Sequence, residues 1–264
     1  MALLHVDFFS ETLGMSSQMD VILPQQTQGQ IGMEGKGASG KFQTLYLLHG
    51  MSDDHTTWQR RTSIERYVAP LGIAVVMPTT HLGWYTDMAY GFDYWTYMTQ
   101  ELPKICQEFF PLSEAREDNF VAGLSMGGYG AFKMALGAPD KFCAGASLSG
   151  GLIPYHCYSD EPGADNSLWE DIFGPREGVP GSDNDLFTLV DRLAASGQEK
   201  PMLYQWCGTE DFLYQDNVQF RDFMAGKGFD YTYEQSPGVH AWEYWDEKIQ
   251  TVLSWLPISK PAKN

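Results

Sequence analysis

Short apolar runs alternate along the chain with longer stretches that mix apolar and polar residues. Turn residues bound the apolar runs, which is typical of buried strands, and the runs predict strands over 43–48, 73–77, 142–148, 202–207 and 230–235, with one more that begins at Asn119. The mixed stretches predict helices over 62–69, 92–110, 126–137, 214–226 and 242–256. Pro103 is expected to kink or split the second of these helices. Alternating strands and helices imply a mostly parallel sheet that carries helices on both faces.

The N-terminal part of the chain follows another pattern. Residues 3–9 and 18–23 predict the two strands of a leading antiparallel pair. Residues 24–41 are rich in glutamine and glycine, which is typical of a surface loop. No candidate chemistry lies in this loop, so we expect the functional residues further along the chain.

Residues 152–199 interrupt the alternation of strands and helices. They are rich in proline and glycine, and short helical pieces are predicted near 167–173 and 185–195. We expect this segment to be a small insertion over the active site rather than a separate domain. A chain of 264 residues often forms one undivided α/β domain, so we predict a single domain over residues 1–264.

The stretch from Asn119 to Gly130 predicts a strand, a tight turn and a helix, with Ser125 at the turn. Gly123 and Gly127 flank this serine in the G-x-S-x-G spacing of a nucleophile elbow, which holds the serine oxygen clear of the backbone. Glycine is needed on both sides because the strand and the helix nearly touch. In a chain this rich in glycine the motif arises by chance in roughly one sequence of six, so a plain glycine turn is the alternative.

A serine hydroxyl is a weak nucleophile and needs a base to accept its proton. His240 is the best candidate because it follows the last predicted strand in a short loop. His49 ends a strand directly before Gly50, a position that suits a structural role in bracing the loop that follows. The other histidines lie in loops, in the leading strand or in the insertion.

The base needs a carboxylate that fixes its tautomer, and Asp211 is the candidate because it follows the strand over 202–207. The competing carboxylates are Glu210 and Asp216. The chain order Ser125, Asp211, His240 is the order of an α/β-hydrolase, and we predict this fold. All these loops follow strands, so we expect them to gather at the carboxyl edge of the sheet.

An oxyanion needs two N–H donors that are already in place. Met126 follows the nucleophile and would supply one of them. The loop after the strand over 43–48 would supply the other, and the Gly50-Met51 step makes the Met51 N–H the candidate. A simple turn at His49-Gly50 is the alternative.

Aromatic residues gather in the loop over 79–91 and next to the candidate base. Trp84 and Tyr85 could wall an acyl pocket, and Trp242 could add to its rim. The alternative is that these side chains belong to the core.

The net charge of −17 argues against nucleic acids and anionic membrane surfaces as partners, because both need a basic footprint. The four cysteines are widely spaced and indicate reduced, mostly buried thiols rather than a disulfide framework or a zinc site. The N-terminus lacks the basic region of a signal peptide, and no apolar run is long enough to span a membrane. We therefore expect a cytoplasmic protein with a small-molecule substrate and no bound metal or cofactor; a homo-oligomer is left open.

The chain resembles the esterase D group of α/β-hydrolases over nearly its whole length. Within that group it is most similar to the small bacterial tributyrin esterases. The segments that carry the resemblance are Tyr46-Leu47-Leu48-His49-Gly50-Met51-Ser52, Gly83-Trp84-Tyr85-Thr86-Asp87, Tyr90-Gly91-Phe92-Asp93-Tyr94, Ala122-Gly123-Leu124-Ser125-Met126-Gly127-Gly128-Tyr129-Gly130, Trp206-Cys207-Gly208, Asp211-Phe212-Leu213-Tyr214, His240 and Trp242.

The resemblance implies a cofactor-free carboxylesterase that acts on short-chain acyl esters, with Ser125, Asp211 and His240 as its triad. The same group contains S-formylglutathione hydrolases, which have a cysteine where this chain has Ser52-Asp53-Asp54. That departure and the negative charge argue against a glutathione thioester. Relatives that deacetylate sugars or release feruloyl groups leave those substrates open. A catalytically silent binding protein of the same fold is the alternative from another class.

Overall fold

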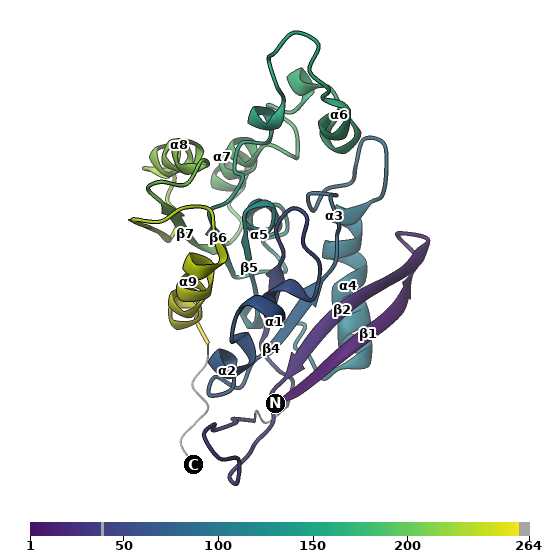
Figure 1. Ribbon diagram of the computed structural model, residues 1–264, viewed down its shortest axis with the longest axis vertical. Helices are drawn as coiled ribbons and strands as arrows, with labels where there is room; N and C mark the ends of the chain where they lie inside the picture. The colour runs from purple at the N-terminus through teal and green to yellow at the C-terminus, as the bar shows by residue number, and fades with distance from the viewer. Residues whose placement is uncertain (38–39, 259–264) are drawn as a thin grey trace.

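A computed structural model describes residues 1–37 and 40–258 of the chain (Figure 1). Its centre is an eight-stranded sheet in the order β1-β2-β4-β3-β5-β6-β7-β8. The strands are β1 (Ala2–Ser10), β2 (Met15–Leu23), β3 (Thr44–Leu48), β4 (Ala74–Pro78), β5 (Asn119–Leu124), β6 (Ala144–Leu148), β7 (Met202–Gly208) and β8 (Tyr231–Ser236). From β4 to β8 all neighbours are parallel, whereas β2 pairs antiparallel with both β1 and β4. The mostly parallel sheet and the leading antiparallel pair are thus confirmed.

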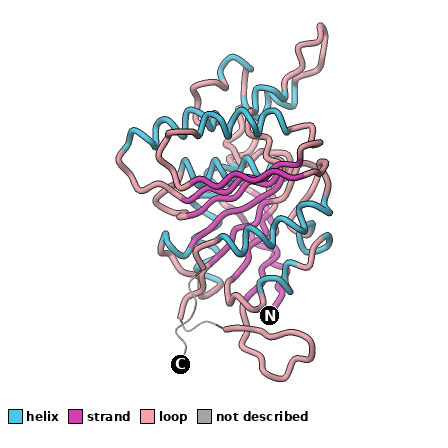
Figure 2. The backbone as a smooth tube through the Cα atoms, turned by 90° about the vertical axis from the view of Figure 1, so that its left-hand side faces the viewer, coloured by secondary structure: helices cyan, strands magenta, loops and turns pink. Residues whose placement is uncertain are grey.

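Helices cover both faces of the sheet (Figure 2). The larger helices are α4 (Leu102–Phe109), α5 (Met126–Gly137), α7 (Leu186–Ser196), α8 (Tyr214–Met224) and α9 (Trp242–Trp255). Alternate side chains of β3 enter two different cores: Tyr46 and Leu48 pack with α4, α5, α7 and α8, whereas Leu45 and Leu47 pack with α9 and two short helices. A strand buried on both sides must be apolar throughout, which explains its continuous apolar run.

Two predicted helices differ in detail from the structure. The region predicted as one helix over 62–69 holds α2 (Ile64–Val68), and α1 (Thr57–Arg61) precedes it without having been predicted. The helix predicted over 92–110 consists of α3 (Tyr94–Thr96), a π-helical turn over Tyr97–Glu101, and α4. Pro103 lies in the first turn of α4, directly after the π-helical turn. Proline has no N–H to donate to the preceding turn, so the hydrogen-bond pattern changes there.

The segment over 152–199 forms an insertion with two α-helices, α6 (Ser167–Phe173) and α7, close to their predicted places, and two short 3₁₀ helices over Pro154–Cys157 and Arg176–Gly178. Figure 1 shows α6 at the upper end of the molecule, far from α2 at the lower end. The loop predicted over 24–41 has neither helix nor strand in its described part, and residues 38–39 of it lie outside the described residues.

All four cysteines are free, and Cys106, Cys143 and Cys207 are buried, as predicted. Across residues 1–37 and 40–258 no helix is long and apolar enough to cross a membrane.

Candidate active site

Ser125 lies in the tight turn between β5 and α5 with φ +53° and ψ −119°, a conformation that a non-glycine residue rarely adopts. The flanking glycines make this turn sterically feasible. A Cβ on Gly123 would lie 2.3 Å from the carbonyl oxygen of Gly127, and a Cβ on Gly127 would lie 2.5 Å from the carbonyl oxygens of Leu48 and His49. These distances are steric clashes with backbone atoms, which cannot move aside as a flexible side chain could. Only glycine therefore fits at either position.

The structure brings Ser125, His240 and Asp211 into one hydrogen-bonded series. His240 Nε2 lies 3.0 Å from Ser125 Oγ, and His240 Nδ1 lies 2.8 Å from Asp211 Oδ2. The Asp211 side chain is fully buried, and its Oδ1 also accepts the backbone N–H of Leu213 at 2.9 Å. A buried carboxylate can only accept, so it favours the imidazole tautomer that carries its proton on Nδ1. Nε2 is then free to accept the proton of the Ser125 hydroxyl.

The two competing carboxylates are engaged elsewhere. Glu210 Oε2 accepts the backbone N–H of Gly238 at 2.6 Å and thereby ties together the loops that follow β7 and β8. Asp216 lies in the first turn of α8, where its Oδ1 is 2.9 Å from Nδ1 of His156 in the insertion. The sequence alone could not separate these neighbours, because the direction of each side chain depends on the turn after β7.

The two predicted oxyanion donors lie on either side of Ser125. Met126 is the first residue of α5, where the N–H groups of a helix have no partner within the helix. The loop after β3 approaches from the other side, since a Cβ on Gly50 would lie 3.6 Å from the Cβ of Ser125. The peptide that joins Gly50 to Met51 therefore lies beside the serine.

His49 holds this loop from beneath. Its ring is almost fully buried, Nδ1 is 2.7 Å from the carbonyl oxygen of Gly50, and Nε2 accepts the backbone N–H of Thr80 at 3.0 Å. These contacts require a neutral ring with its proton on Nδ1. Burial lowers the pKa of His49 to about 4. The structure thus supports the structural role predicted for His49.

We expect the stability of the fold to fall in mild acid because of His49. Its pKa is about 4 in the folded protein against 6.5 for the free side chain, so between these values the unfolded chain binds more protons and stability rises with pH. Lowering the pH from about 7 to about 4.5 should cost roughly 2.5 kcal/mol from this residue. Urea unfolding at both pH values would measure the loss. His49→Gln should flatten the dependence, whereas His81→Gln, in an exposed loop, should keep most of it, because burial outweighs the charge of His81 in lowering the pKa of His49. An unchanged dependence in the first variant would contradict this account.

The predicted aromatic wall is more deeply buried than expected. Tyr85 has no exposed surface, and its hydroxyl donates to the carbonyl oxygen of His49 at 2.8 Å. Its side chain therefore braces the loop after β3, which corrects the prediction that it walls an acyl pocket. Trp84 retains 5% exposure beneath the α6 residues Trp169 and Phe173. Trp242 packs edge-on against Trp58, with ring centres 5.2 Å apart.

Three residues near the site were missed. Phe212 is 76% exposed and its ring centre lies 4.5 Å from that of His240. Trp245 contacts the same imidazole edge-on at 4.8 Å. The carboxylate of Asp53 would lie 3.4 Å from a Cβ on Gly50, and burial raises its pKa. Phe212 directly follows Asp211 in the sequence, and this adjacency to the candidate acid could have indicated that Phe212 lies at the site.

The fold, together with the hydrogen-bonded series at the carboxyl edge of its sheet, places this chain in the class of α/β-type serine hydrolases. The Esterase family model, described as "Putative esterase", matches residues 10–256. The chain therefore belongs to this family and is a carboxylic ester hydrolase.

Individual relatives agree with the family. The chain is 29% identical to an acetyl esterase of Caldicellulosiruptor saccharolyticus, covering 97% of this chain and 98% of the relative. Among solved structures it is similar to the fluorophosphonate-binding serine hydrolase FphF of Staphylococcus aureus, with 37% identity, a TM-score of 0.86, and 98% and 99% of the two chains covered. It is also similar to the S-formylglutathione hydrolase FrmB of the same organism, with 38% identity, a TM-score of 0.83, and 97% and 98% covered.

Proposed function

We propose that this protein hydrolyses short-chain acyl esters by two-step acyl transfer, with Ser125 as the nucleophile and His240 as the base. The observation that carries the proposal is the 3.0 Å contact between His240 Nε2 and Ser125 Oγ, backed by the buried carboxylate of Asp211. This is the arrangement that converts a serine hydroxyl into a nucleophile.

In the first step, Ser125 Oγ attacks the ester carbonyl while its proton passes to His240 Nε2. Asp211 stabilises the imidazolium, and the N–H groups of Met126 and Met51 bind the oxyanion. His240 then gives the proton to the departing alcohol. A water molecule releases the acid from the acyl-enzyme by the same route.

A short acyl group is supported by the relative named acetyl esterase. Gly50, Trp84 and Trp242 are the proposed substrate contacts, and Phe212 joins them because it lies exposed against the ring of His240. A tributyrin-type or acetyl ester is the substrate we favour. We infer one domain over residues 1–264. The free thiols support a reducing, cytoplasmic setting.

S-formylglutathione hydrolysis is the second candidate, because FrmB is 38% identical over nearly the whole chain. The Asp53 carboxylate beside Gly50 argues against it, since glutathione thioesters carry carboxylates of their own and like charges repel.

An ester panel would test the choice. We expect kcat/KM to be highest for p-nitrophenyl acetate, p-nitrophenyl butyrate and tributyrin, and lower by at least about tenfold for p-nitrophenyl octanoate, methyl ferulate, acetylated xylan and S-formylglutathione. Asp53→Asn should raise kcat/KM for S-formylglutathione more than for the neutral acetate. A preference of the wild type for S-formylglutathione over every ester would replace the first candidate with the second.

A further inference from the structure

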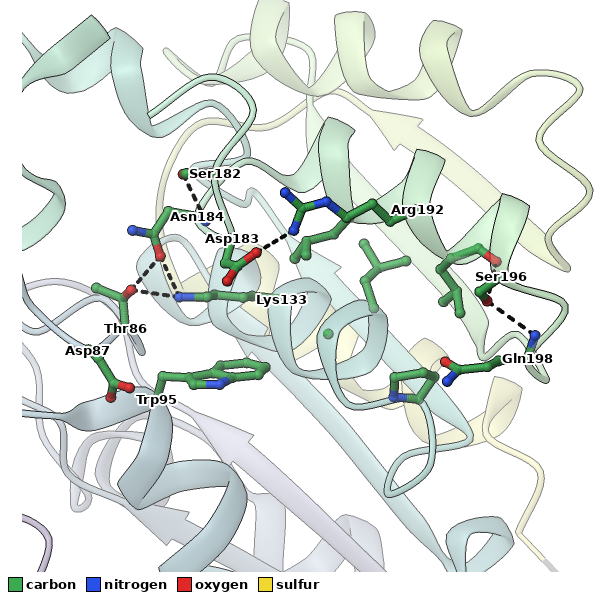
Figure 3. A pocket seen from close by; sticks show the side chains of 15 residues that line it. Thr86, Asp87, Trp95, Lys133, Ser182, Asp183, Asn184, Arg192, Ser196 and Gln198 are labelled. Atoms are coloured by element: carbon green, nitrogen blue, oxygen red, sulfur yellow. Dashed lines mark hydrogen bonds and ion pairs between the residues drawn. The ribbon is translucent and has the colours of Figure 1, made fainter. Parts of the chain in front are cut away.

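A cavity of about 620 Å³ lies away from the proposed catalytic residues. It opens between α5 and the insertion (Figure 3), and its walls come from α5, α7, the loop over 182–184 and Trp95. Neither Ser125 nor His240 lines it. Lys133, which does line it, lies eight residues after Ser125, so the two are separated by about 12 Å along the helix axis.

Lys133 is the unusual feature of this cavity. The residue is 3% exposed, and its Nζ donates to Thr86 Oγ1 at 2.6 Å and to Asn184 Oδ1 at 2.7 Å. Figure 3 shows the side chain running over Trp95, whose ring centre is 5.0 Å from Nζ. Within residues 1–37 and 40–258, no carboxylate lies within ion-pair distance of this ammonium.

A buried ammonium without a counter-ion is costly, because hydroxyl and amide oxygens replace only part of its hydration. Burial accordingly lowers the pKa of Lys133 to about 7, although Asp87 and Asp183 act in the opposite direction. An anion bound at Nζ would relieve this cost. The cavity beside Nζ has the volume of a small-molecule site.

The surrounding groups define which anion fits. Asp87 and Asp183 lie close enough to act on Lys133, so they repel a doubly charged anion more strongly than a singly charged one. Arg192 is already paired with Asp183. Beyond the charged end, the lining is mixed: Leu136, Leu189 and Leu193 on facing helices supply apolar surface, and Ser196 and Gln198 supply polar groups. A ligand with one negative charge and an apolar body would place its charge at Lys133 and its apolar part against the leucines.

We propose that this cavity binds a small organic monocarboxylate, whose carboxylate pairs with Lys133 and whose apolar part lies against the leucines of α5 and α7. The site is separate from the proposed catalytic centre and does not depend on its assignment. Because it lies where the insertion meets α5, a ligand there should also stabilise the folded protein.

Calorimetric titration with 4-phenylbutanoate at about pH 6 would test the proposal, with 4-phenylbutanamide as the uncharged counterpart. We expect the acid to bind and to raise Tm, and the amide to bind at least about tenfold more weakly. Lys133→Met should weaken binding of the acid by at least about tenfold while remaining folded, because a buried charge is replaced by an apolar side chain of similar length. Lys104→Met, at an exposed position on α4, is the matched control and should bind like the wild type.

A pH series adds a second readout. Binding to the wild type should weaken between about pH 6 and about pH 9 as Lys133 loses its proton. The charged groups that face this cavity besides Lys133 are Asp87, Asp183 and Arg192. Absence of binding by the wild type would overturn the proposal. So would equal binding by Lys133→Met, which would locate the acid elsewhere, for example at Ser125.

Ser196→Trp tests the location of the ligand without removing the charge of Lys133. Ser196 lies at an exposed position on the cavity rim, so the larger side chain should weaken binding of the acid. Full binding by this variant would also contradict the proposal.

Discussion

Ser125→Ala is expected to lower kcat on p-nitrophenyl acetate by at least about 10⁴-fold, the scale seen when a triad nucleophile is removed. The alanine keeps the turn between β5 and α5 but has no oxygen opposite His240 Nε2, which lies 3.0 Å from Oγ in the structure. The oxyanion donors remain, so a small residual rate over water should persist. KM should change little because the acyl and alcohol contacts are unaltered.

The control for this variant is Ser254→Ala, an exposed serine on α9, which should keep activity within about twofold of the wild type. A fluorophosphonate probe should label the wild type and the control but not Ser125→Ala. Activity of Ser125→Ala within about tenfold of the wild type would refute the nucleophile assignment. Failure of the probe to label the wild type would instead revive the catalytically silent binding protein.

The strands and the order of the site residues could be predicted because their signals are local. A strand such as β3 (Thr44–Leu48) is almost entirely apolar because helices cover both of its faces, and a run of this kind is visible in the sequence. Residues in loops that follow parallel strands meet at one edge, so Ser125, Asp211 and His240 could be brought together without coordinates.

What could not be predicted depends on the direction of side chains in three dimensions. Tyr85 lies in a loop whose backbone has positive φ, and this conformation turns its ring inward to the carbonyl of His49. Phe212 points outward against His240, although it is as apolar as the buried residues around it. The short helix α1 was missed because its five residues show too little of a helical period, and the buried Trp58 secures it from the tertiary structure.

Asp211→Asn is expected to lower kcat by about 10⁴-fold, because the asparagine can present an N–H₂ group to His240 Nδ1. The imidazole would then carry its proton on Nε2, and that nitrogen could no longer accept the proton of Ser125. The buried position of Asp211 strengthens this effect, since no water can substitute for the lost acceptor. The Leu213 N–H can still be bound by the amide oxygen, so the fold should survive.

The adjacent carboxylate supplies the matched control. Glu210→Gln removes one negative charge at the neighbouring position but leaves His240 with its partner, so kcat should stay within about fivefold of the wild type. Glu210 accepts the Gly238 N–H, which a glutamine oxygen can also do, so the loop after β8 should keep its place. Far-ultraviolet circular dichroism and kcat would be measured on both variants. A large loss of kcat in Glu210→Gln with little loss in Asp211→Asn would transfer the role of the acid to Glu210, since the two side chains leave the same turn in different directions.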